Sequence, residues 1–149
     1  MSTVLFQEDA LQTERVNDSI QVLITVNVVN GKASFQDSKG NEYAITSEEI
    51  TLIGSGGAPR EFRLVFTLSK EAEGYTFANP ALKFFQGGSK KAGFRVAPET
   101  GTMVTLSTFN LLAAEDQPVR DEFSVLVNSP SGKVIAHDPT ILWEPPKGV

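Results

Sequence analysis

The stretch Ile20-Gln-Val-Leu-Ile-Thr-Val-Asn-Val28 decides the fold. Apolar residues occupy every second position in it, and most of them are β-branched, which is the pattern of a strand with one face in a core. Asn30 and Gly31 follow almost at once, and both tolerate the positive φ that a two-residue hairpin turn requires. We therefore expect residues 33–36 to fold back against this strand as a β-hairpin.

Short runs of the same kind recur along the rest of the chain. The expected strands and returning strands cover residues 42–45, 50–52, 62–68, 75–85, 94–97, 103–111, 123–127 and 133–143. Pro80 cannot donate to a strand ladder, so the stretch 75–85 is expected to lie at a sheet edge or to carry a bulge. Turns are expected at 38–41 and 129–132, and the capping-box spacing of residues 46–49 predicts a single helical turn.

The predicted elements fit one all-β domain. No window of helical length shows a clean helical stripe, whereas eight or nine short antiparallel strands in two sheets are typical of a β-sandwich. The 149 residues, 40% of them hydrophobic, suffice for a single domain over 1–149, with the ends 1–15 and 145–149 loosely held. The chain has no cysteine, which excludes disulfides, thiolate metal sites and a cysteine nucleophile.

The C-terminal segment carries a more specific pattern. Phe123, Val125 and Val127 alternate, the Pro-Ser-Gly turn at 130–132 reverses the chain, and Asp138-Pro139 is expected to break the returning strand and step it onto the next pairing. This arrangement resembles the closing hairpin of an immunoglobulin-like sandwich.

Two dipeptides near the end of the chain point to a family. Asp138-Pro139 and Glu144-Pro145 lie six residues apart, and this pair resembles the DP-EP family of small bacterial proteins. The resemblance implies an immunoglobulin-like β-sandwich and a bacterial source, and it supplies no catalytic residues to carry over.

The charge distribution argues against several partners. The net charge is −5, which disfavours nucleic acid through long-range repulsion. The chain has no apolar run long enough for a signal peptide or a membrane span, so a cytoplasmic location without membrane contact is expected.

Catalytic and metal-binding residues are not expected. His137 is the single histidine, and its neighbour Asp138 should point to the opposite face of a strand, which prevents direct pairing. The adjacent acids at 115–116 and 121–122 leave glycosidase-type chemistry as an alternative. The segment 37–42 has oxygen ligands like those of a calcium loop, but it lacks the spacing of an EF-hand loop and contains Lys39, and a glycine-containing β-turn explains it, so we expect no cofactor or metal.

Two features remain as candidate binding sites. The glycines at 87–88 present Lys90 and Lys91 close to Lys83 and Arg95, a group that would bind an anion or an acidic protein surface, or would simply be a solubilising hairpin tip. Trp143 is a candidate for stacking on a sugar.

The sequence thus predicts a non-catalytic interaction module that binds a protein partner or self-associates as a homo-oligomer. An edge strand would provide the surface, either at 75–86 or at the C-terminal strand near Trp143. The alternative is binding of a small ligand or carbohydrate at a loop end of the sandwich.

Overall fold

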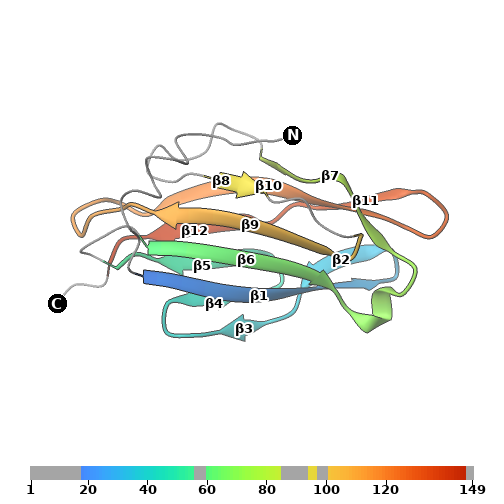
Figure 1. Ribbon diagram of the computed structural model, residues 1–149, viewed down its shortest axis with the longest axis horizontal. Coiled ribbons are helices and arrows are strands. Elements are labelled where there is room, and N and C mark those ends of the chain that lie inside the picture. Colours follow the sequence, from blue (N-terminus) through green and yellow to red (C-terminus); the bar gives the residue numbers. More distant parts are fainter. Residues whose placement is uncertain (1–17, 56–59, 85–93, 97–100, 147–149) are drawn as a thin grey trace.

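Two β-sheets face each other in the computed structural model of the protein, which describes residues 18–55, 60–84, 94–96 and 101–146 (Figure 1). The first sheet has the order β2-β1-β6-β9-β8, with bounds β1 (Asp18–Val29), β2 (Lys32–Phe35), β6 (Arg60–Leu68), β8 (Phe94–Val96) and β9 (Met103–Asn110). The second has the order β11-β10-β12-β5-β4-β3, with bounds β3 (Ser38–Lys39), β4 (Tyr43–Ile45), β5 (Glu49–Ile53), β10 (Val119–Asn128), β11 (Val134–His137) and β12 (Thr140–Glu144). Strand β7 (Thr76–Phe84) pairs with β10, and a short 3-10 helix, η1 (Lys70–Ala72), precedes it. The expected all-β sandwich is confirmed.

The first strand and its hairpin form as the sequence predicts. Val22, Ile24 and Val26 of β1 are fully buried, whereas Leu23 on the opposite face is 61% exposed. Asn30 and Gly31 adopt φ angles of 53° and 75°, so the two-residue turn brings β2 back antiparallel to β1.

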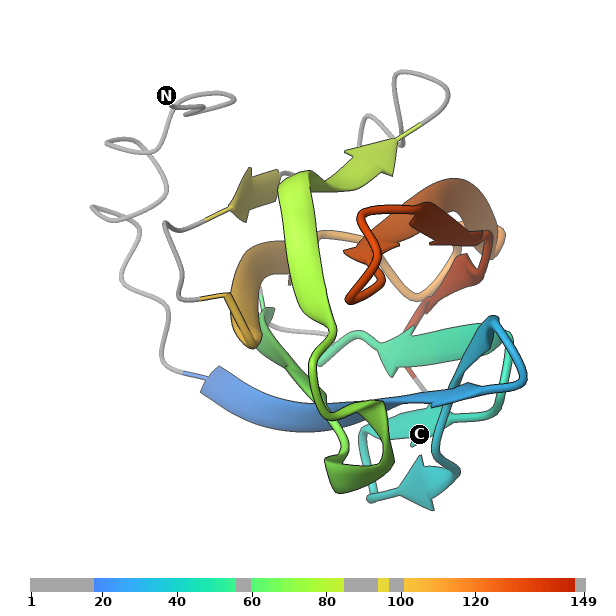
Figure 2. The ribbon, with the colours of Figure 1, turned by 90° about the vertical axis from the view of Figure 1, so that its right-hand side faces the viewer.

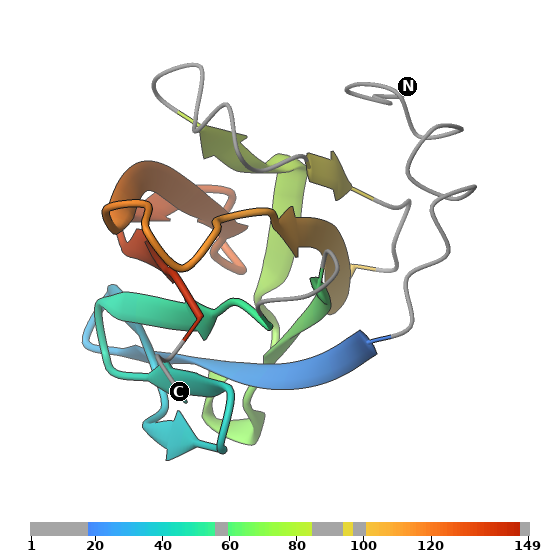
Figure 3. The ribbon, with the colours of Figure 1, turned by 90° about the vertical axis from the view of Figure 1, so that its left-hand side faces the viewer.

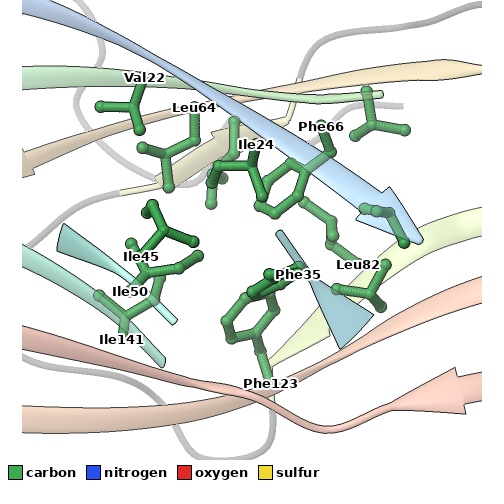
Figure 4. Packing of buried hydrophobic residues seen from close by; sticks show 14 of the residues in the cluster. Val22, Ile24, Phe35, Ile45, Ile50, Leu64, Phe66, Leu82, Phe123 and Ile141 are labelled. Atoms are coloured by element: carbon green, nitrogen blue, oxygen red, sulfur yellow. The ribbon is translucent and has the colours of Figure 1, made fainter. Parts of the chain in front are cut away.

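The core lies between the two sheets. Figure 4 shows side chains of both sheets directed toward one another, with Ile24 and Phe66 on one side and Ile50 and Phe123 on the other. Phenylalanine rings connect the layers: the ring centroids of Phe66 in the first sheet and Phe123 in the second are 6.4 Å apart, and Phe35, also in the first sheet, lies 5.9 Å from Phe66. A single hydrophobic cluster thus joins both sheets.

Strand number and direction differ from the expectation. The structure has twelve strands in its described part, and two pairs are parallel: β1 with β6, and β5 with β12. After β2 the chain crosses to the second sheet and only then returns, so β6 arrives beside β1 in the same direction. Alternating patterns indicate which face of a strand is buried but do not specify its neighbours, which is why the prediction of antiparallel strands throughout is wrong at these two pairs.

Two expected turns are also corrected. Residues 46–49 form no helical turn; the Thr46 N–H donates to the Glu49 carbonyl at 2.9 Å and closes a tight turn between β4 and β5. The alternating burial of β5, which begins at Glu49, leaves no room for a helix. Residues 38–39 form the short strand β3, and the turn expected at 38–41 starts only at Gly40, whose N–H donates to the Tyr43 carbonyl.

The edge position of the proline-containing stretch is confirmed. Strand β7 pairs on one side with β10, and no strand of the described residues pairs with its other side. The register between them shifts between Val125 and Val127, which is the irregularity expected next to Pro80.

The predicted break at Asp138-Pro139 is confirmed, because β11 ends at His137 and β12 begins at Thr140, but the chain does not leave β10 there. Val125 pairs with His137 and Glu122 pairs with Thr140, so β11 and β12 follow β10 in one continuous register. What changes is the other side: β12 pairs with β5, whereas β11 has no strand on its outer edge among the described residues. The interruption therefore leaves β11 as a free sheet edge.

A candidate binding cleft between two sheet edges

A cleft of about 530 Å³ opens between the β1–β2 hairpin and β11. Its lining comes from three segments: Val29, Gly31, Lys32, Ala33 and Ser34 of the hairpin, Ser47 and Glu48 of the β4–β5 turn, and Ala136 and His137 of β11. The β1–β2 hairpin and the β10–β11 hairpin reach the same end of the molecule (Figure 1), and Figure 2 looks onto that end. Because β2 and β11 are the outermost strands of their sheets among the described residues, the cleft is bordered by one sheet edge from each layer.

Backbone groups of β2 point into this space. The Phe35 N–H donates to the Ser47 carbonyl at 3.1 Å, so the backbone of Phe35 faces away from β1. In an antiparallel pair every second residue has the same backbone orientation. Ala33, two residues earlier, therefore directs its N–H and C=O toward the cleft that it lines.

The backbone of β11 alternates in the same way. The Thr140 N–H donates to the Glu48 carbonyl at 3.1 Å, away from β10, whereas the Pro139 carbonyl accepts from Phe123 of β10. Because orientation alternates along one continuous register, Ala136 also turns its backbone away from β10. Within the described residues, neither Ala33 nor Ala136 has a backbone partner on this outward side.

The β4–β5 turn closes the inner end of the cleft through His137. The Nε2–H of His137 donates to the Ser47 carbonyl at 2.9 Å, the same oxygen that accepts from Phe35. The imidazole is 9% exposed and meets the Phe35 ring edge-on at a centroid distance of 4.9 Å. Burial lowers the pKa of His137 below 6.5, although the Ser47 carbonyl and the charges of Glu48 and Asp138 act in the opposite direction.

The neutral form of His137 is therefore favoured. Since Nε2 carries the hydrogen that Ser47 accepts, Nδ1 is left as an acceptor. Asp138 lies on the opposite face of the strand as predicted: it is exposed, and Ser124 Oγ donates to its Oδ1 at 2.5 Å.

Trp143 is not available for stacking on a ligand, which corrects the sequence-based candidate. It is 1% exposed, and its Nε1–H donates to Oδ2 of Asp121 at 2.8 Å in the core. The alternation of β12 places Ile141 and Trp143 on the buried face of the second sheet, so the aromatic ring contributes to packing.

The other sequence-based candidates are not brought together in the described residues. Lys83 is exposed on β7, whereas Lys90 and Lys91 lie outside the described residues. Arg95 belongs to β8, but its side chain is outside the described part. Their common anion-binding role therefore stays a prediction.

The DP and EP dipeptides have structural partners. Pro139 is buried and its carbonyl accepts from Phe123 at 3.2 Å. The Glu144 carbonyl accepts from Gly54 at 2.9 Å, and Pro145 beside it is half-buried. Both dipeptides thus lie where β12 begins and ends.

The acidic residues considered for catalysis have other contacts. Asp121 and Glu122 lie within β10 rather than in a loop, and Asp121 is occupied by Trp143. Oδ2 of Asp116 accepts from the Ala113 N–H at 2.7 Å.

In the parts of the chain that are described, no group of three His, Cys, Asp or Glu residues is placed to hold a metal ion, and no helix has the length and apolar character to cross a membrane.

Sequence reasoning missed both the cleft and one buried polar link. Asn110 is 2% exposed, and its Nδ2 donates to the carbonyls of Leu52 and Glu144 at 3.0 Å each, while its Oδ1 accepts from Leu112 at 2.9 Å. It ties β9 of the first sheet to β5 and β12 of the second, at the end where the chain passes from β9 to β10 (Figure 3). Asn110 falls on the inward-facing alternation of β9, and this position could have predicted a buried polar link, because a buried amide requires hydrogen-bond partners.

Comparisons with known proteins give little further information. No family model matches the chain, and no curated protein matches it. Among solved structures, the crystal structure of the inclusion body protein PixA from Burkholderia cenocepacia J2315 is similar at 10% sequence identity and a TM-score of 0.45, over 91% of this chain and 98% of that one. The resemblance to the DP-EP family stays a prediction.

Proposed function

We propose that the protein is a non-catalytic binding module that takes up an extended segment of a partner protein by strand addition at the cleft between β2 and β11. The observation that carries the proposal is the β4–β5 turn, whose Ser47 and Glu48 carbonyls already pair with Phe35 of β2 and Thr140 of β12. Farther along the same two edges, Ala33 and Ala136 line the cleft and direct their backbone groups toward it. A bound segment would continue the pairing that the turn begins.

The side chains around the cleft suit such a segment. Backbone hydrogen bonds provide affinity in strand addition, and pockets for side chains provide specificity. Val29 is 59% exposed and lines the cleft, which gives a bound segment an apolar surface to cover. We also propose, as the sequence predicts, that the protein comes from a bacterium and is located in the cytoplasm.

Selection from a displayed library of short peptides tests it. We expect enrichment of sequences with strand-forming residues that bind the wild-type protein. Ala33→Pro and Ala136→Pro should each weaken binding of the enriched peptides, because proline removes an outward N–H without removing a bond to β1 or β10. Loss of one such hydrogen bond corresponds to roughly 0.5–1.5 kcal/mol, or about two- to tenfold in affinity.

A control variant tests the competing location. The double reversal Lys90→Glu with Lys91→Glu changes the basic loop and leaves the cleft intact. Peptide binding that survives this reversal and falls in both proline variants, with their far-UV spectra and unfolding midpoints unchanged, supports the cleft. Absence of enriched peptides, or binding that the proline variants retain in full, would overturn the proposal.

A further inference from the structure

The two edges of the cleft run in the same direction from an outer to an inner end. Lys32 is the first residue of β2, and Lys133 directly precedes β11, so both lie at the hairpin tips. At the other end of these strands the rings of Phe35 and His137 meet. Figure 1 shows both tips at one end of the molecule.

Charge is unequal along the cleft. At the outer end, Lys32 lines the cleft and is exposed, and Lys133 is exposed at the neighbouring hairpin tip. At the inner end, Glu48 lines the cleft as an exposed carboxylate and acts electrostatically on His137. The Glu48 carboxylate at the inner end therefore favours a positively charged group there.

The two ends are far enough apart to act separately. Phe35 follows Lys32 by three positions, which corresponds to about 10 Å along a strand. That length is similar to the Debye length of roughly 8–10 Å at physiological ionic strength. Each end therefore interacts mainly with the charge placed directly against it.

We infer that the bound segment is an extended peptide with a charge at each end of the cleft, an acidic side chain against Lys32 and a basic side chain against Glu48. The inference rests on the proposed function and adds the chemistry of the partner. Charge complementarity of this kind favours the correct partner and disfavours like-charged ones.

Three synthetic peptides test the inference. All three have eight residues of alternating valine and threonine as a strand-forming frame, with two charged positions four residues apart, which places both charges on one face. One peptide carries glutamate and lysine, the second two glutamates and the third two lysines. We expect the mixed peptide to bind wild-type protein roughly two- to fivefold more tightly than either uniform peptide, and this preference should disappear in 1 M salt, where the Debye length is about 3 Å.

Charge reversals of the protein provide the matched test. Lys32→Glu replaces the base that lines the outer end by an acid and should shift the preference toward the two-lysine peptide, whereas Glu48→Lys replaces the acid that lines the inner end and should shift it toward the two-glutamate peptide. The combined variant has inverted ends, and a mixed peptide bound in the opposite direction should recover its preference. Lys83→Glu changes the charge by the same amount on β7 and should leave the order unchanged.

The outcomes separate this inference from the proposed function. Equal binding of all three peptides that is still lost in Ala33→Pro and Ala136→Pro would overturn the inference and retain strand addition. Binding of no peptide would overturn both. A preference that ignores Lys32→Glu and Glu48→Lys would place the charged contacts elsewhere and overturn the inference.

Discussion

His137 holds the inner end of the cleft through two separable contacts, and a set of substitutions can measure each. His137→Leu removes the hydrogen bond to Ser47 and keeps an apolar side chain against Phe35. His137→Gln keeps a donor for Ser47 and removes the ring. His137→Ala removes both.

The expected losses follow from these contacts. A net intramolecular hydrogen bond contributes about 1 kcal/mol, and the Leu variant should fall at or below this value because the Ser47 carbonyl still accepts from Phe35. The edge-on ring pair contributes roughly 0.5–1.5 kcal/mol, which is the loss expected for Gln. Ala should lose about 2–3 kcal/mol, since both contacts are absent and a cavity remains.

Urea unfolding at pH 8 is the appropriate assay, because the imidazole is neutral in both folded and unfolded protein at that pH. The free energy of unfolding, taken with a shared slope, gives the loss for each variant. If Ala costs no more than Leu, the ring contact is not contributing, and a loss below about 0.5 kcal/mol for Ala would refute the assignment of His137 as the tie between β11, the β4–β5 turn and β2.

Three further predictions concern the rest of the sandwich. Asn110→Ala removes the side-chain partner of the Leu52 carbonyl and of the Leu112 N–H, while the Glu144 carbonyl still accepts from Gly54, so we expect a loss of about 2–4 kcal/mol in urea unfolding; a loss below about 0.5 kcal/mol would contradict the link between the sheets. Asp121→Ala should cost about 1–3 kcal/mol and red-shift the emission of Trp143, the single tryptophan, whereas unchanged emission would show that the indole is not held there. Because burial lowers the pKa of His137 in the folded state, the contribution of His137 to stability is complete above pH 6.5 and is lost as the pH falls from 6.5 through the lowered pKa. The thermal unfolding midpoint of the wild type should therefore fall more steeply with acid than that of His137→Gln, and parallel pH profiles would contradict this expectation.

Local patterns in the sequence predicted the parts of the fold that depend on neighbouring residues. Alternation from Ile20 to Val28 placed β1, and the Asn30-Gly31 pair placed the turn to β2. The parallel pairing of β1 with β6 joins residues about forty positions apart, and no local pattern specifies it.

The cleft could not be predicted for the same reason. Its lining joins β2, the β4–β5 turn and β11, which meet only after the chain has crossed between the sheets. The wrong assignment of Trp143 to a surface has a related cause, since its position close to the chain end gave no indication that Asp121 would be its buried partner. The alternation of Ile141 and Trp143 was the more reliable signal.

Amide hydrogen exchange in the presence of an enriched strand-forming peptide tests the central claim most directly. Strand addition at the cleft predicts that the N–H groups of Ala33 and Ala136 exchange freely in the unbound protein and become protected when the peptide binds, while amides of β7 remain unchanged. Protection on β7, or binding that leaves both alanine amides unprotected, would contradict the account.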